Sequence, residues 1–369
     1  MSLFISSVAM SFYLWLRNHP SSVRIYSNKR YRRDADQCIA NYSDEECIDL
    51  FRLDKLGIEF FTDIINEHSL ITRKTKAGLP PKAQFLVALR YLATGNSLRS
   101  LVNTAGLDLS VGATENCIKN VCFALTSFSS DFIKYSWTPS AVSVIKQGFS
   151  QYGNFPGALG AIDGTKIKIK APSVDENAYV GRHPGHYLNC QVICDHRLKL
   201  VDVVAKWPGS VNDSVIWENC GFKRQLEAYF SSMPSSHKAW LIGDSGYASE
   251  KYMMVPFAEC TNISQERYNK SHKKTRNKVE RAIGVLKSRF RCLCKESGGA
   301  IQFDEITACN IFIACAMLHN YCIERNFKEM ISPDVLQKEQ LNQDNSSAHG
   351  GIPGGFEARR KVVEQYFSS

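Results

Sequence analysis

The sequence predicts an α/β region with a mixed sheet, preceded by a wholly helical region. Two observations support this fold class. Apolar residues before residue 150 recur at helical spacing, whereas several segments after it alternate between apolar and polar residues, as strands do. The chain has 369 residues, of which 44% are hydrophobic. It is therefore long enough to bury the cores of two domains.

Four regions are expected along the chain. Residues 1–40 form a flexible basic arm, residues 41–150 a helical domain, residues 151–327 the α/β domain, and residues 328–369 a partly disordered tail with a short terminal helix. The apolar start of the chain is too short to cross a bilayer, which needs about 20 residues, and no later segment qualifies. We therefore expect no membrane-spanning segment.

Three helices are predicted at the start of the helical domain. Ser43 and Glu46 have the spacing of a capping box, so a helix should begin there and continue through Phe51. Apolar residues at helical spacing predict a second helix over residues 55–67. A third should span residues 80–95, because it is opened by proline and closed by glycine.

Residues 97–125 have the outline of a helix-turn-helix. A helix is predicted first, then a short turn over residues 105–109, then a second helix that would contact DNA. The same pattern fits an ordinary helical hairpin. The pattern alone favours the hairpin, because Lys119 is the one basic residue on the candidate recognition helix.

Strands are predicted from residue 157 onward. The segment GALGAIDGTKIKIKAP alternates, with Ile167 and Ile169 on one face and lysines on the other. YLNCQVICD and LKLVDVVAKW form an antiparallel hairpin across a short turn. A helix over residues 212–230 and a fourth strand, AWLIGDSGY, follow. A hairpin followed by a crossover helix is the build of a ribonuclease H-like core.

Two more helices complete this prediction, and one of them carries an acid of interest. The stripe of Val279, Ile283 and Leu286 predicts that the long helix packs over the sheet, and a further apolar helix spans about residues 306–324. Glu280 lies about 100° from Val279 around the helix axis, at the border of this stripe. It should therefore lie at the rim of the sheet.

Three acids are expected to meet at this rim. Asp163 and Asp244 share strand parity with buried residues and end their buried rows, and strand ends are where sites form in open α/β sheets. With Glu280 they would form a site for hard divalent cations, Mg²⁺ or Mn²⁺, with two ions per site. Asp213 is a fourth candidate ligand.

Each acid also has an ordinary structural alternative. Asp163 could cap a turn, Asp244 could form an Asx turn, and Glu280 could pair with Arg276. Asn212 or Asp213 could cap the following helix. Taken singly, these alternatives are favoured for the first three acids, and for Asp213 the cap and the ligand are equally favoured. The joint placement of Asp163, Asp244 and Glu280 at converging ends favours a metal site.

The most basic segment of the chain surrounds Glu280. Residues 267–291 contain ten Lys or Arg residues and one carboxylate, and the chain as a whole carries a net charge of +9. Such a segment favours an acidic partner, and double-stranded DNA is expected. The predicted DNA-binding residues are Lys273, Lys274, Arg276, Lys278, Lys287, Arg289 and Arg291.

Several motifs, in this order, resemble the PIF/Harbinger superfamily of DDE transposases and the nucleases derived from them. They are GALGAIDGTKIKIKAP, WPGSVNDSVIW, LIGDSGY, RNKVERAIGVLKSRFRCL and LHNYCI, and the resemblance covers roughly residues 45–325. It implies that Asp163, Asp244 and Glu280 are the catalytic triad, with 35 residues between the last two as in the family. It further implies that Asp213 is an additional acid of the metal site. A helix-turn-helix and a Myb/SANT-like DNA-binding partner protein are implied as well.

The expected function is a divalent-metal-dependent DNA endonuclease and transposase that cuts phosphodiester bonds and joins strands. Two alternatives remain: a domesticated DNA-binding or scaffold protein without transposition, and a ribonuclease for RNA–DNA hybrids. A homodimer is expected because transposition usually needs two active sites. The basic run NKRYRR suggests a location in the nucleus, with the cytoplasm as a second compartment.

Overall fold

The structure is a computed structural model that describes residues 39–71, 79–102, 104, 109–181, 184–232, 239–294, 299–328 and 353–368. The chain divides into two compact units. The first comprises the described residues up to Phe132 together with Arg289–Lys328, and the second comprises Ile133–Ser288 and the described residues that follow residue 328. The predicted arm, with NKRYRR, lies outside the described residues except for its last two positions.

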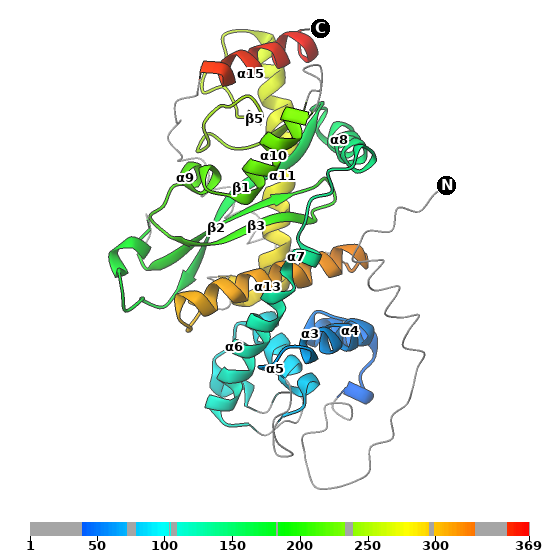
Figure 1. Ribbon diagram of the computed structural model, residues 1–369, viewed down its shortest axis with the longest axis vertical. Helices are drawn as coiled ribbons and strands as arrows, with labels where there is room; N and C mark the ends of the chain where they lie inside the picture. Colours follow the sequence, from blue (N-terminus) through cyan, green and yellow to red (C-terminus); the bar gives the residue numbers. More distant parts are fainter. Residues whose placement is uncertain are drawn as a thin grey trace. The chain divides into compact units, whose positions relative to one another are not determined.

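The first unit is built from helices (Figure 1). In chain order its elements are α3 (Asp44–Phe51), α4 (Lys55–Asn66), α5 (Pro81–Thr94), η1 (Leu98–Leu101), α6 (Val111–Ser127), α7 (Ser129–Phe132), η4 (Arg291–Leu293) and α13 (Glu305–Glu324).

Local sequence signals set the ends of the first helices. Both hydrogen bonds of the capping box between Ser43 and Glu46 form at the start of α3. Helix α5 begins at Pro81 and ends before Gly95, whose φ of 66° is a backbone conformation that glycine adopts without strain. The predicted starts and ends of these helices are confirmed.

An aromatic cluster forms the core of this unit. The ring of Phe61 lies 5.4 Å from that of Phe132 and 5.3 Å from that of Tyr321, between centroids. The hydroxyl of Tyr321, on α13, donates to Asp54 at 3.2 Å. Among the described helices, α13 is the one long and apolar enough to cross a membrane, yet 72% of its apolar window is buried inside the protein. It therefore serves as the core helix of this unit.

The described residues do not show the predicted helix-turn-helix. Its first helix is a single 3₁₀ turn, η1, because α5 ends only at Gly95 and leaves little chain before the turn. Residues 105–108 of the predicted turn lie outside the described residues. On α6, the candidate recognition helix, Lys119 pairs with Glu115 at 2.8 Å.

The second unit contains a mixed sheet with the order β3-β2-β1-β4-β5 among its described strands. These strands are β1 (Ala158–Ile169), β2 (His186–Cys194), β3 (Leu200–Pro208), β4 (Trp240–Ile242) and β5 (Met253–Met254). Strands β1, β2 and β3 pair antiparallel, whereas β1, β4 and β5 pair parallel. The mixed sheet and the hairpin of β2 and β3 were predicted, but the two-residue β5 is too short to show a pattern in the sequence.

The turn between β2 and β3 is stabilised by a buried aspartate. One carboxylate oxygen of Asp195 accepts hydrogen bonds from the backbone N–H groups of Arg197, at 2.8 Å, and Lys199, at 2.9 Å. Leu198 takes a positive φ of 70° to close the turn. This turn fixes the register of the hairpin, in which Val192 of β2 lies opposite Val203 of β3. In the separate pairing of β2 with β1, Val192 lies opposite Asp163.

The helices of the second unit are α8 (Pro139–Gly153), η3 (Glu176–Tyr179), α9 (Asp213–Glu218), α10 (Gly221–Ser232), α11 (Ile263–Arg289, the last residue of which belongs to the first unit) and α15 (Pro353–Tyr366). Figure 1 draws α10 and α11 on opposite sides of the sheet. The predicted single helix over residues 212–230 is two helices, because the backbone leaves the helical conformation at Asn219, with φ of −105° and ψ of 10°.

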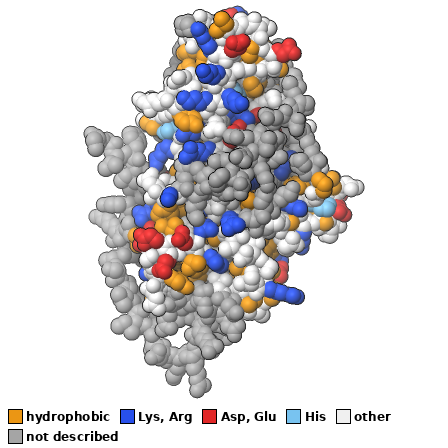
Figure 2. All heavy atoms as spheres, turned by 180° about the vertical axis from the view of Figure 1, so that it is seen from behind, with side chains coloured by type: hydrophobic (Ala, Val, Ile, Leu, Met, Phe, Trp, Pro, Cys, Tyr) orange, Lys and Arg blue, Asp and Glu red, His pale blue; other side chains and the backbone are white. Residues whose placement is uncertain are grey.

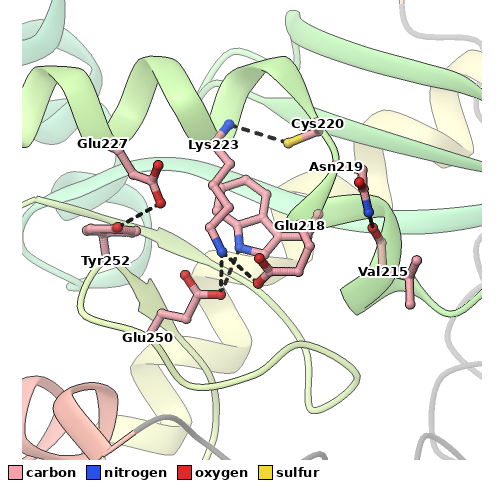
Figure 3. Close-up of polar contacts among 9 residues, drawn as sticks. Val215, Glu218, Asn219, Cys220, Lys223, Glu227, Glu250 and Tyr252 are labelled. Atoms are coloured by element: carbon pink, nitrogen blue, oxygen red, sulfur yellow. Dashed lines mark hydrogen bonds and ion pairs between the residues drawn. The ribbon is translucent and has the colours of Figure 1, made fainter.

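A buried charged network joins α9 and α10 to the loop before β5 (Figure 3). The Lys223 ammonium lies 2.6 Å from Glu218 and 3.1 Å from Glu250. The indole of Trp217 donates to the same carboxylate oxygen of Glu250 at 3.1 Å. Lys223 is 9% exposed and Glu250 is 5% exposed, so each neutralises a charge that would otherwise be buried alone.

Two side chains of helix α11 contact the backbone at β5, the edge strand of the sheet. The hydroxyl of Tyr268 donates to the carbonyl of Val255 at 3.0 Å, and His272 Nε2 lies 3.0 Å from the carbonyl of Met254. Burial lowers the pKa of His272 to about 3, so the ring is neutral and Nε2 carries the proton that it donates. The predicted stripe from Val279 to Leu286 is fully buried.

The division into units differs from the boundaries predicted at residues 150 and 327. Helix α8 belongs with the sheet, since it packs on β1, and α13 belongs with the helical unit, where Asn320 donates to the carbonyl of Phe132 at 3.0 Å. In the predicted tail, residues 329–352 lie outside the described residues. Helix α15 packs on the second unit, with the ring of Phe367 5.6 Å from that of Phe155.

Candidate active site

The parallel pairing of β1 and β4 ends at one place in the sheet. The last paired residues are Ala161 and Ile242, and Asp163 and Asp244 each follow two positions later. Because strand side chains alternate, both acids continue a row of buried residues. Asp163 was predicted to lie at the end of its strand. It lies in the middle of β1 instead, because β1 continues to Ile169 as the antiparallel partner of β2. What ends just before Asp163 is the parallel pairing of β1 with β4.

Asp163 is the most enclosed of the acids, with 2% of its surface exposed. One carboxylate oxygen accepts from the Gly164 N–H at 2.9 Å and the other lies 3.3 Å from an Arg276 nitrogen. Burial raises the pKa of Asp163 well above its usual value; Arg276 opposes this rise, and the carboxylates of Asp244, Asp213 and Glu280 add to it. Asp244, Asp213 and Glu280 therefore each lie within electrostatic reach of Asp163.

Asp213 lies against Gly164, the residue that follows Asp163, because Gly164 has no side chain. A Cβ on Gly164 would lie 2.5 Å from a carboxylate oxygen of Asp213. The same oxygen accepts from the amide of Asn189, on β2, at 2.6 Å, and that amide also donates to the carbonyl of Val211 at 2.8 Å. Asn189 thus orients Asp213 toward the sheet.

The helix-cap alternative for this region is not what the structure shows. Asn212 occupies the N-cap position of α9, but its side chain makes no capping hydrogen bond. Asp213 is the first residue of the helix, and its carboxylate is held by Asn189 on the sheet.

Asp244 follows β4 and is 9% exposed. Its carboxylate accepts from the Gly246 N–H at 2.9 Å, which is the Asx turn foreseen as its structural alternative. The neighbouring Tyr247 is fully buried, and its hydroxyl lies 3.4 Å from Gln191. Burial, with added contributions from Asp213, Asp163 and Asp244, raises the pKa of Tyr247. The turn and the acidic cluster are therefore compatible roles for Asp244.

Glu280 approaches the cluster from α11 and is 8% exposed. It forms an ion pair with Arg276, one helical turn earlier on α11, which is the alternative foreseen for it. Asn277 donates to its second oxygen at 3.4 Å. Since Arg276 contacts both Glu280 and Asp163, the ion pair places Glu280 in the cluster as well.

The donor set fits a hard divalent cation. Carboxylate oxygens are the ligands that Mg²⁺ and Mn²⁺ prefer, and a cation relieves the repulsion that the buried acids exert on one another. Within the described residues, no group of three or more His, Cys, Asp or Glu side chains is arranged closely enough to hold a metal ion as the side chains stand. Arg276 lies between two of the four acids.

The predicted DNA-binding residues differ in exposure. Lys273, Lys274 and Arg291 are exposed, and Lys278 is half-buried, with its ammonium 3.9 Å from the ring centroid of Tyr152. Lys287 is 8% exposed and Arg289 is 1% exposed, and Arg276 is turned toward the acids. Burial of these last three side chains does not favour contact with a phosphate backbone.

Exposed bases instead form a stripe along α11. Positions three or four residues apart lie on one face of a helix. Arg267, Lys270, Lys274, Lys278 and Arg281 follow this spacing over about 21 Å of helix, and we call them the basic stripe. Figure 2, which views the molecule from behind, shows Lys and Arg side chains repeated along the face on which α11 lies.

Three residues of the site, Gly164, Asn189 and Tyr247, were missed from the sequence, where they looked like ordinary strand and turn residues. Arg276 was foreseen as a partner of Glu280, but its contact with Asp163 was not. One signal could have pointed to Gly164, because a glycine directly after Asp163 leaves room for a neighbour.

Comparison with known proteins gives the same family as the motifs. The family model of the DDE superfamily endonucleases matches residues 162–320. "Putative nuclease HARBI1" of Homo sapiens and of Bos taurus are each 30% identical over 300 residues, which is 81% of this chain and 83% of each relative.

A plant relative and the solved structures complete the comparison. "Protein ALP1-like" of Arabidopsis thaliana is 26% identical over 268 residues, which is 69% of this chain and 64% of that protein. No solved structure matches the chain. The acidic cluster at the end of the parallel strands, the family model and the 30% identical relatives agree, and the chain belongs to the PIF/Harbinger type of the DDE endonuclease superfamily.

Proposed function

We propose that this protein is a divalent-metal-dependent endonuclease that cuts DNA phosphodiester bonds, with Asp163, Asp244 and Glu280 as its catalytic carboxylates and Asp213 as a fourth ligand. The observation that carries the proposal is that Arg276 contacts both Asp163 on β1 and Glu280 on α11, while Asp244, after β4, and Asp213, at the start of α9, also act on Asp163. Burying several like charges together costs free energy, and a bound cation would offset this cost by neutralising their repulsion.

The carboxylates are held in place before any substrate arrives. Backbone N–H groups hold Asp163 and Asp244, and the amide of Asn189 holds Asp213. Low exposure strengthens every charge interaction in the site. Mg²⁺ or Mn²⁺ at this cluster, two ions in our proposal, supplies activation of water and stabilisation of the leaving oxygen. Joining of the released 3′-hydroxyl to a second DNA belongs to the same proposal.

The basic stripe supplies the contact to double-stranded DNA in this proposal. Its five side chains lie on the exposed face of α11, the helix that also carries Glu280. Contacts of Lys and Arg with phosphates provide affinity and position the duplex, but they carry little sequence information. Recognition of a particular DNA sequence at the ends of a mobile element would need further contacts with the bases. We propose that a Myb/SANT-like DNA-binding partner protein supplies them.

The decisive experiment compares the unmodified chain with Glu280→Gln. We expect the unmodified chain to cut duplex DNA in the presence of Mg²⁺ or Mn²⁺ and not in EDTA. The variant, which loses one charge at nearly unchanged volume, should cut at least about a hundredfold more slowly while binding DNA equally well. Lys361→Gln, on the exposed face of α15, is the matched control and should cut normally.

Three results would redirect the proposal. Equal cutting by both proteins would point to a contaminating nuclease. DNA binding without cutting by the unmodified chain would support the alternative, a domesticated DNA-binding or scaffold protein. Preferential cutting of an RNA–DNA hybrid over the duplex would support a ribonuclease.

Assembly and location are part of the proposal. Because a cut-and-paste reaction acts on two DNA ends, we propose a homodimer, which sedimentation of the chain with and without DNA would test. We propose the nucleus as its main location, with the cytoplasm as the second. Microscopy of the tagged chain, with and without the run NKRYRR, tests this.

A further inference from the structure

Arg276 is the cation at the centre of the acidic cluster. One of its guanidinium nitrogens lies 3.3 Å from Asp163, and the other forms an ion pair with Glu280. Its side chain is 14% exposed. Burial disfavours its charge, but Asp163, Glu280 and Asp244 outweigh burial and raise the pKa of Arg276. The guanidinium therefore stays charged and binds two of the proposed metal ligands.

The position of Arg276 on α11 separates it from the basic stripe. The stripe residues are exposed or half-buried and follow the outer face of the helix, whereas Arg276 points to the sheet. A phosphate-binding role explains the stripe but not this inward side chain. Its contacts suit a different role, which is to neutralise carboxylates that repel one another.

A guanidinium and a divalent cation are alternative partners for the same carboxylate oxygens. Both are cationic, and both take the lone pairs that Asp163 and Glu280 direct into the cluster. If both contacted the same two acids, the positive guanidinium would lie next to the positive ion, and this repulsion is strong at low exposure. The two cations therefore cannot both keep these contacts.

We propose that Arg276 is an internal counter-ion that competes with the divalent cation for Asp163 and Glu280, so that metal binding displaces its guanidinium from these carboxylates. This inference rests on the proposed metal site. Arg276 then has a positioning role. Its guanidinium keeps the acids close together and raises the concentration of divalent cation that is needed to occupy the site. The opposing model is a fixed anchor, in which Arg276 holds Glu280 in place while the cation binds.

The two models predict opposite changes in metal affinity. The test titrates the full-length chain, without DNA, with Mn²⁺ and measures free Mn²⁺ by its electron paramagnetic resonance signal. Removing a competing positive charge should make Arg276→Gln bind Mn²⁺ about tenfold more tightly. The matched control is Arg360→Gln, the same change at an exposed position on α15, which should alter the affinity less than about twofold.

A second measurement uses the unmodified chain, so it does not depend on the variant folding. Phenylglyoxal modifies accessible arginines, and peptide mass spectrometry reports each site. Saturating Mg²⁺ should raise the modification of Arg276 severalfold and leave that of Arg360 unchanged.

The outcomes separate this inference from the proposed function. Equal or weaker Mn²⁺ binding by Arg276→Gln, or equal protection of Arg276 with and without Mg²⁺, would overturn the counter-ion model. The absence of Mn²⁺ binding by both proteins would overturn it as well. Tighter binding by the variant together with no DNA cutting by the unmodified chain would leave the counter-ion model standing and reject the nuclease.

Discussion

At the residue scale, each acid of the cluster has a local role as well as a shared one. Asp244 closes an Asx turn with Gly246, and Glu280 pairs with Arg276. Local hydrogen bonds of this kind orient a carboxylate without using all its lone pairs. A structural role for one acid is therefore no argument against a site, and what distinguishes the site is that the other three acids all act on Asp163.

Gly164→Ala tests whether Asp213 belongs to the site. The added Cβ would lie 2.5 Å from the Asp213 carboxylate, so this acid must move while its chemistry is unchanged. A displacement of about 1 Å in a catalytic group can cost about a hundredfold in rate, and we expect a loss of that order in metal-dependent cutting. Adding Asp213→Asn to Gly164→Ala should cost little more.

The control for this variant is Gly221→Ala, because a Cβ at Gly221 would contact only the end of Arg224, at 4.0 Å. It should cut at the normal rate. Undiminished cutting by Gly164→Ala would show that the position of Asp213 does not matter to the reaction.

At the element scale, three short or broken elements decide where the site forms. Strand β4 has three residues, so its pairing with β1 ends before Asp163 and Asp244. Helices α9 and α10 are separate, and the start of α9 carries Asp213. The Lys223 network then ties both helices to the loop before β5.

Lys223→Met should destabilise this part of the protein. It leaves Glu250 buried without its cation, and removing one partner of a buried ion pair typically costs about 3 kcal/mol or more. Urea denaturation measures the change in the free energy of unfolding. The double variant with Glu250→Gln should recover more than half of the loss, because no unpaired charge remains.

The matched control for this loss is Lys361→Met, which breaks the exposed pair with Glu357 on α15. Exposed pairs contribute about 0–1 kcal/mol, so this variant should unfold nearly as the unmodified chain does. Equal losses for Lys223→Met and Lys361→Met would show that the buried network does not stabilise the fold.

At the scale of the whole molecule, the net charge of +9 is distributed unevenly. Helix α11 has bases on its exposed face and an acid with its counter-ion on another, so one element serves both the proposed DNA contact and the proposed metal site. This arrangement would bring the phosphate backbone and the carboxylates into the same unit of the protein.

Lys270→Gln combined with Lys274→Gln should weaken DNA binding in a salt-dependent way. Each lost phosphate contact lowers the steepness of log affinity against log salt by about 0.9, so the double variant should lose about 2 from the slope. Fluorescence anisotropy with duplex DNA at several salt concentrations measures it. Arg360→Gln with Lys361→Gln removes the same charge from α15 and should leave the slope unchanged.

Much of the second unit could be predicted from sequence patterns. Strand alternation identified β1, β2 and β3, and the acids Asp163, Asp244 and Glu280 were chosen from parity and helix position alone. The patterns missed strand β5 and the break at Asn219 and Cys220, because a two-residue strand has no period and so short a break hardly alters the apolar spacing. Helix patterns also could not assign α13 to the first unit.

The sequence by itself determined the local structure and the list of acids, because capping residues, glycines and hydrophobic periods act over a few neighbours. Only the tertiary structure decided how the acids meet. It placed Gly164 under Asp213, Asn189 beside it, and Arg276 between Asp163 and Glu280. Apart from the pair of Arg276 and Glu280, which are four residues apart on α11, these relations join residues from 24 to 113 positions apart. They depend on strand register and helix packing, which no short segment specifies.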